Sequence, residues 1–172
     1  MLRPEINCVI LGSFRFKREI DLAREEFEDL GVLVLAPEPG SVYSPPSRRQ
    51  IFVAKGFRPL PSEVNQPIAK VEGDFLRAID RAHFTYLVNL DGYVGTTVSF
   101  EIGFVLARGI PLYAMCPIDT RPDPDLWWQN IVARIPVLSP SDALNDFKQK
   151  LNPSSTSTLP LPSSSQSPAC RR

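Results

Sequence analysis

The stretch LVNLDGYVGTTVSFEIGFVLARGIP, residues 87–111, decides how this chain is expected to fold. It opens with an apolar run that has the length of a buried strand and continues into a loop with two glycines. A helical segment follows and is closed by Gly109-Ile110-Pro111, because glycine and proline are common where a helix stops. Another apolar run comes next. The order strand, loop, helix, strand is typical of an α/β protein.

Glu101 is the unusual residue in this helix. It lies three residues after Val98 and four before Val105, so all three share the stripe that should face the sheet. A carboxylate in an apolar stripe is unfavourable unless it binds something or takes part in a reaction. Glu101 is therefore the main catalytic candidate. The alternative is a glutamate tied into a structural hydrogen-bond network.

The rest of the chain repeats the same alternation. Strands are expected at residues 7–11, 32–36, 85–90, 111–115 and 134–138, and helices at 17–30, 68–82, 97–108, 123–133 and 141–151. Alternating strands and helices predict a parallel sheet of about five strands with helices on both faces, a three-layer α/β sandwich. Pro136 marks the fifth strand as an edge strand.

One domain is expected over residues 1–151. Within it, residues 38–66 are rich in Pro, Gly and Ser and are predicted to form a long loop insertion, with a short edge strand at residues 51–54. Residues 152–172 are dominated by Ser, Thr and Pro and have no hydrophobic period. They are predicted to form a disordered tail.

Composition narrows the class of protein and its partners. The 172 residues carry 19 basic and 19 acidic side chains, so no net field favours nucleic acid or a membrane surface. Three widely spaced cysteines indicate neither a disulfide framework nor a paired metal motif, and fit a reducing compartment. No secretory signal is visible, and the longest apolar stretch, residues 102–118, is interrupted. We expect a cytoplasmic protein without a metal site, since there is one histidine.

Two loops are expected at the same edge of the sheet. Gly12-Ser13 and residues 91–97 both follow strands, and in open parallel sheets ligands bind beyond the carboxyl ends of strands, where the strand order reverses. The strand order itself cannot be read from the sequence.

These loops carry a family resemblance. Leu11-Gly12-Ser13-Phe14-Arg15, together with Gly95-Thr96 and Phe100-Glu101-Ile102-Gly103, resembles the nucleoside 2-deoxyribosyltransferase-like family, which includes deoxynucleoside 5′-monophosphate N-glycosidases. The resemblance spans roughly residues 7–118. It implies a flavodoxin-like (Rossmann-like) domain that forms a homodimer or a higher homo-oligomer, needs no cofactor and acts on a small-molecule nucleoside or nucleotide.

The resemblance also implies a reaction. Family members cleave the bond between a base and a (deoxy)ribose, and Glu101 matches the glutamate that attacks the anomeric carbon. The sugar then passes to a second base or to water. A fixed carboxylate suits this carbon, because positive charge builds there in the transition state. The dipole of its helix and the hydroxyls of Thr96 and Thr97 would keep Glu101 ionised.

The chain departs from the family where the leaving base should be protonated. The family has an aspartate six residues before its glutamate, and this chain has Gly95 there. Asp91, ten residues before Glu101, is the second catalytic candidate, provided that the loop folds back; the alternative is an ordinary Asp-Gly turn. Asp74 is offset by one residue from another family aspartate, and His83 stands where the family often has a third.

The remaining candidates bind substrate. Backbone N–H groups at Gly12 and Ser13, the Ser13 hydroxyl and the Arg15 guanidinium suit a phosphate or a sugar hydroxyl. Tyr93 is expected to orient the sugar. The helix start at Gly95, Thr96 and Thr97 completes the set. A plain turn with a solvated Arg15 is the alternative for the first loop.

The sequence therefore predicts cleavage or transfer of an N-glycosidic bond in nucleosides or nucleoside monophosphates. Two alternatives remain open. One is a non-catalytic nucleotide-sensing module, favoured by the glycine at position 95. The other is an NAD-type glycohydrolase, in which the loop at residues 38–66 covers the second half of a dinucleotide.

Overall fold

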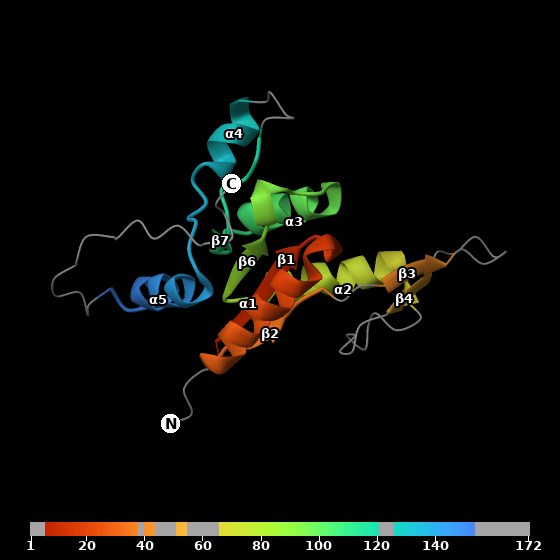
Figure 1. Ribbon diagram of the computed structural model, residues 1–172, viewed down its shortest axis with the longest axis horizontal. Helices are drawn as coiled ribbons and strands as arrows, with labels where there is room; N and C mark the ends of the chain where they lie inside the picture. The colour runs from red at the N-terminus through yellow and green to blue at the C-terminus, as the bar shows by residue number, and fades with distance from the viewer. Residues whose placement is uncertain (1–5, 38–39, 44–50, 55–65, 121–125, 154–172) are drawn as a thin grey trace.

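The computed structural model describes residues 6–37, 40–43, 51–54, 66–120 and 126–153 (Figure 1). Its centre is a parallel sheet in the order β2 (Leu33–Leu35), β1 (Asn7–Gly12), β6 (Phe84–Val88) and β7 (Leu112–Ala114). Every residue of β6 is buried, as expected for a strand covered on both faces. The predicted mixed α/β fold with a parallel sheet is confirmed, and it is of the Rossmann-like kind.

The sheet has four strands rather than about five. The segment predicted as the fifth strand, residues 134–138, joins the sheet only through a bridge between Val137 and Ala114. Ala114 N–H donates to the Pro136 carbonyl (2.9 Å) and Leu138 N–H donates to the Ala114 carbonyl (3.0 Å). Pro136 has no N–H group to extend the pairing, which is why this segment remains a single bridge.

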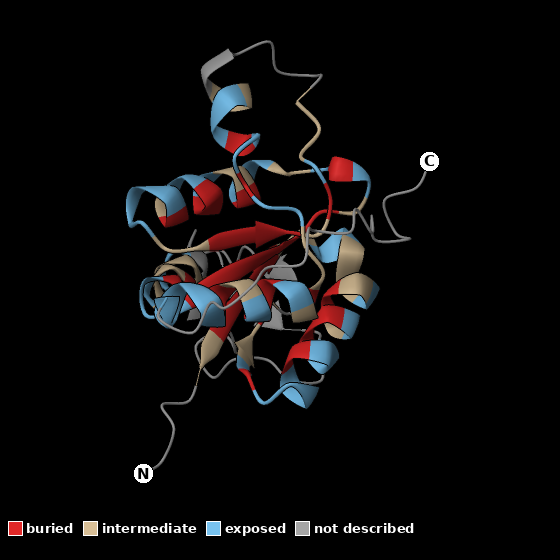
Figure 2. Ribbon diagram, turned by 90° about the vertical axis from the view of Figure 1, so that its left-hand side faces the viewer, coloured by how far each residue is buried: buried red, intermediate tan, exposed pale blue. Residues whose placement is uncertain are grey.

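Helices cover both faces of the sheet. Alternate side chains of β1 point to opposite sides, with Cys8 and Ile10 in one core and Val9 and Leu11 in the other. The first core is closed by α1 (Lys17–Asp29) and α5 (Pro140–Leu151). The second is closed by α2 (Ile68–Asp80), α3 (Thr96–Ala107) and α4 (Leu126–Val132). Figure 2 shows the buried strands between helices that are buried on their inner sides.

The segment predicted as an irregular loop contains regular structure. β3 (Gly40–Tyr43), β4 (Ile51–Ala54) and β5 (Gln66–Pro67) form a second, antiparallel sheet in that order. It lies against one end of α2, away from the four main strands (Figure 1). The strand expected at residues 51–54 is present, but it pairs in this sheet and not at an edge of the main one. The rest of the predicted insertion lies outside the described residues.

Three further expectations meet the structure only in part. Among the described residues, no helix has the length and apolar character needed to cross a membrane. Cys8 is a free, buried thiol, whereas Cys116 is disulfide-bonded, a bond that the cysteine spacing did not predict. Of the predicted tail, residues 154–172 lie outside the described part of the chain.

Candidate functional site

β1 and β6 lie side by side in the middle of the sheet, with Gly12 paired to Val88 at their carboxyl ends. From β1 the chain crosses through α1 to β2 on one side and later returns to β6 on the other, so the strand order reverses between them. The loops that follow, residues 13–16 (the β1 loop) and residues 89–95 (the β6 loop), therefore flank the topological switch point. This confirms that both predicted loops share one edge.

The β1 loop is a turn of 3₁₀ helix, η1 (Phe14–Phe16), capped by Ser13. Arg15 N–H donates to Ser13 Oγ (3.5 Å), and Phe16 N–H donates to the Ser13 carbonyl (2.9 Å). A Cβ at position 12 would lie 3.0 Å from the Val88 carbonyl oxygen, so Gly12 allows the two strand ends to approach closely. The Ser13 hydroxyl is thus partly engaged in capping.

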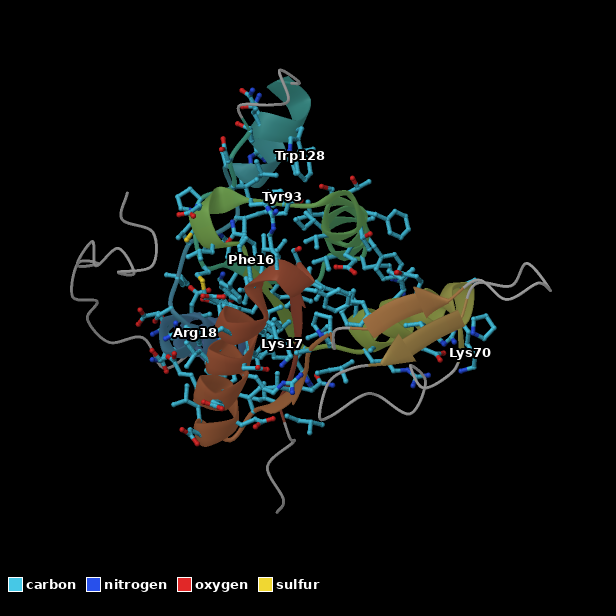
Figure 3. All side chains as sticks on the ribbon, turned by 45° about the vertical axis from the view of Figure 1, so that its right-hand side comes forward. Phe16, Lys17, Arg18, Lys70, Tyr93 and Trp128 are labelled. Atoms are coloured by element: carbon cyan, nitrogen blue, oxygen red, sulfur yellow. The ribbon has the colours of Figure 1, made fainter. Side chains whose placement is uncertain are left out.

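An aromatic contact joins the two loops. The Arg15 guanidinium lies over the Tyr93 ring, 4.1 Å from its centroid, and the Phe16 ring meets the same ring edge-on at 6.0 Å. Phe16 and Tyr93 are neighbours in Figure 3. Arg15 and Tyr93 are both exposed, so their polar ends remain open to a ligand. The structure brings together these two predicted residues, which are 78 positions apart in the sequence.

The β6 loop leads from this contact to the start of α3. Its first part is a 3₁₀ turn, η2 (Leu90–Gly92), in which Asp91 is exposed and has a left-handed backbone with φ of 54°. Tyr93 lies across Gly95, since a Cβ there would be 3.5 Å from the phenol oxygen. Gly95 is the N-cap of α3, and no side chain caps this end. Thr96 and Thr97 are exposed in the first turn, where free N–H groups favour an anion.

Glu101 is buried in α3, with 7% of its surface exposed, beside Val98, Ile102 and Val105. The shared stripe predicted from the spacing is therefore confirmed. Its carboxyl group has no hydrogen-bond partner among the described residues, so the structural network considered as the alternative is absent there. Burial raises its pKa from 4.5 to about 8, and the negative charge of Glu72 adds to this. Glu101 thus holds a proton at neutral pH in the ligand-free protein.

Glu72 is the residue that the sequence analysis missed. It is half-buried on α2, which packs beside α3, and its charge acts on Glu101. The signal was present in its position next to Val71 and three residues before Phe75, on the inward side of the helix. That signal is weak, because only the packing of α2 against α3 shows which carboxylates meet.

Two other acidic residues of α2, Asp74 and Asp80, are engaged elsewhere. Asp74 forms ion pairs with Lys70 (2.6 Å) and Arg77, and the hydrogen bond from Lys70 is the main cause that lowers its pKa. Asp80 pairs with Arg108 at 2.6 Å. Both carboxylates are therefore held in surface pairs.

His83 directly precedes β6 and therefore lies at the amino ends of the strands, opposite to the candidate site. Its backbone N–H donates to Asn7 Oδ1 (2.8 Å), and its ring Nδ1 accepts from Asn7 N–H (3.1 Å). It is therefore far from the carboxyl ends of the strands, where the candidate site lies.

Two cavities lined by described residues lie next to this edge. A groove of about 910 Å³ between α3 and α4 is lined mainly by apolar side chains, among them Leu106, Trp128 and Ile131. A second cavity of about 400 Å³ lies below the carboxyl end of β7, beside Cys116 and Thr120. No predicted site residue lines either of them. No hydrogen bond or ion pair within the described residues joins Glu101 to Arg15 or Asp91.

The strand order and these loops define a Rossmann-like α/β protein with a candidate polar site at its topological switch point. In comparisons with known proteins, no protein-family model, no curated protein and no solved structure matches the chain.

Proposed function

We propose that this protein cleaves or transfers the N-glycosidic bond of nucleosides or nucleoside monophosphates, with Glu101 as the nucleophile. The observation that carries the proposal is the state of Glu101. It is a buried carboxyl group without a hydrogen-bond partner in the described residues, on the helix that starts at the switch point. A group kept this way raises the free energy of the folded protein, which is expected at a reactive site and not at a structural one.

The neighbouring residues supply binding. The Arg15 guanidinium, held over Tyr93, presents its N–H groups to a phosphate or a sugar hydroxyl. The uncapped start of α3 at Gly95, Thr96 and Thr97 offers further donors for the same groups. Tyr93 orients the sugar with its exposed phenol. These roles place the anionic part of the ligand at the loops and its anomeric carbon toward α3.

The chemistry requires two acidic groups in different states. Ionised Glu101 attacks C1′, the bond from C1′ to the base nitrogen breaks, and the base leaves with a proton. Asp91 is the candidate donor of that proton. Glu72, whose negative charge acts on Glu101, can donate a proton to the base only after it has taken up the one that Glu101 releases on ionising. The sugar ester on Glu101 is then attacked by water, which gives hydrolysis, or by a second base, which gives transfer.

The test is release of free base. The protein is incubated with deoxynucleosides, with their 5′-monophosphates and with NAD, one at a time, and free base is measured by chromatography. In Glu101→Gln the rate should fall on the order of 10³-fold, because the amide keeps the volume and loses the nucleophile. Glu25→Gln, on the exposed side of α1, is the matched control. Turnover within about tenfold of the wild type in Glu101→Gln would show that Glu101 is not the nucleophile.

Two observations favour a non-catalytic nucleotide-sensing module. Burial keeps Glu101 protonated at neutral pH, and Gly95 replaces the family aspartate. In that case a nucleotide binds without any release of base. In the enzyme, base release should instead increase with pH toward about 8 as Glu101 ionises.

A further inference from the structure

We propose that residues 116–119 (the β7 loop) position the ligand-binding side of the candidate site, and that Asn89 and Gly92 are the positioning residues through which they act. The inference rests on the proposed function, but it concerns ligand binding and not the reaction at Glu101. Four hydrogen bonds and two left-handed residues carry it, all of them within the described residues.

Asn89 joins the two loops where β6 ends. It is fully buried, and its side-chain amide bonds to both the carbonyl and the N–H group of Cys116. Nδ2 donates to the Cys116 carbonyl (2.8 Å), and Oδ1 accepts from Cys116 N–H (2.9 Å). Exchanging the oxygen and nitrogen of the amide would set donor against donor, so this pairing fixes its orientation. The first residue of the β6 loop is thereby fixed to the first residue of the β7 loop.

Gly92 joins the same loops three residues later. Its carbonyl accepts from Asp119 N–H (2.8 Å), and its own N–H donates to the Asn89 carbonyl (2.8 Å). Its φ is 77°, and a Cβ there would lie 2.5 Å from the Pro117 carbonyl oxygen and 2.8 Å from the Asp119 nitrogen. Only glycine fits this position, because both the backbone angle and the contact exclude a side chain.

The next residue along the chain is Tyr93. Tyr93 follows directly after the left-handed residues Asp91 and Gly92, so their backbone angles set the direction in which the chain enters Tyr93 and thereby where its ring lies. That ring supports Arg15 on one side and lies across Gly95 on the other. The β7 loop acts on Arg15 indirectly. It holds Asn89 and Gly92, these hold Tyr93, and the Tyr93 ring sets the position of the guanidinium. Exposed side chains held this way bind a ligand with a smaller loss of conformational entropy.

The test compares Gly92→Ala and Asn89→Asp with the wild type. In the first, the new Cβ collides with the β7 loop; in the second, the Cys116 carbonyl loses its donor. Gly31→Ala is the matched control, because Gly31 also has a positive φ (78°) but a Cβ there meets nothing within 4 Å. Loss of stability from backbone strain alone should be similar in the two glycine variants.

The first readout is the NMR signal of the Arg15 side chain, which needs no ligand. A guanidinium over an aromatic ring has its δ and ε protons shifted upfield, and Tyr93→Leu gives the position of the signals without the ring. We expect Gly92→Ala and Asn89→Asp to move the signals toward that position and Gly31→Ala to leave them unchanged. Unchanged signals in both loop variants, with folded spectra, would overturn the proposal.

The second readout is the division between kcat and KM for base release, with the four deoxynucleoside 5′-monophosphates tested one at a time. The loop variants should raise KM by about tenfold or more and leave kcat within about threefold, since binding is changed and Glu101 is not. A fall in kcat with unchanged KM would overturn the proposal. Absence of base release in the wild type would count against the proposed function, and the Arg15 signals would still decide whether the β7 loop positions Tyr93.

Discussion

Replacement of Glu101 by glutamine should stabilise the protein, and increasingly so at higher pH. The pKa of Glu101 is raised from 4.5 to about 8, by burial first and by Glu72 second. The folded protein therefore keeps a proton that the unfolded chain releases above pH 4.5. The contribution of Glu101 to the free energy of unfolding is therefore most favourable below pH 4.5. It falls as pH rises toward 8, because the unfolded state binds fewer protons than the folded state in this window. Glutamine has no ionisable group, so the variant does not lose this part of its stability as the pH rises.

The size of the effect follows from the two pKa values. Each pH unit between them corresponds to about 1.4 kcal/mol, so the full difference is about 5 kcal/mol above pH 8 and about 3 kcal/mol at pH 7. At pH 5 less than about 1 kcal/mol remains. The side chain is only 7% exposed, so solvent screening reduces these values little. The gain of the variant over the wild type should thus grow by about 3–4 kcal/mol from pH 5 to pH 8.

Urea unfolding at pH 5, 6, 7 and 8 measures this difference directly. Glu72→Gln in the wild-type background should make the pH dependence shallower, because it removes the like charge near Glu101. Glu25→Gln, on an exposed position of α1, should give a pH profile parallel to that of the wild type. A constant free-energy difference between Glu101→Gln and the wild type at all four pH values would show that Glu101 ionises normally, and the reasoning from burial would be refuted.

Two further predictions concern the ligand and the tail. Arg15→Ala should weaken the binding of a deoxynucleoside 5′-monophosphate about tenfold or more and leave the binding of the matching nucleoside nearly unchanged. The reason is that an arginine forms its strongest hydrogen bonds with a dianion. Titration of both ligands against both proteins measures this, and equal losses would mean that Arg15 supports the loop. Under reducing conditions, in which the Cys116 disulfide is opened in both proteins, deletion of residues 152–172 should leave the melting temperature and base release nearly unchanged, because this composition buries little apolar surface. A drop of several degrees in a thermal scan would show that the tail docks on the domain.

The main strands and helices could be predicted because their apolar spacing is set by contacts with the sheet. The third predicted helix, α3, illustrates this, since Val98, Glu101 and Val105 are all buried as their spacing requires. The fifth strand was predicted on the same apolar signal and was wrong, because that signal does not measure the missing N–H of Pro136. The small sheet of β3, β4 and β5 was missed because Pro, Gly and Ser surround its short strands.

The candidate site was predictable only as separate loops. Which loops meet depends on the strand order, and this order is fixed by long-range packing that leaves no mark in local spacing. The contact of Arg15 with Tyr93 and the approach of Glu72 to Glu101 both follow from that order. Asp74 was considered because it lies near a position where the family that the chain resembles has an aspartate, whereas in the structure it pairs with Lys70 and Arg77.

The pair Glu72 and Glu101 gives the proposed reaction a consistent electrostatic basis. In the ligand-free protein the charge of Glu72 opposes ionisation of Glu101, and burial opposes it more strongly. A sugar that develops positive charge at C1′ reverses both effects, because it is attracted to the two carboxylates and replaces the missing solvation of Glu101. The interaction is therefore stronger in the transition state than with the neutral ground-state sugar, and only such a difference accelerates a reaction. A binding module has no such cation to compensate Glu101, so glutamine at position 101 would serve it at least as well and would be more stable.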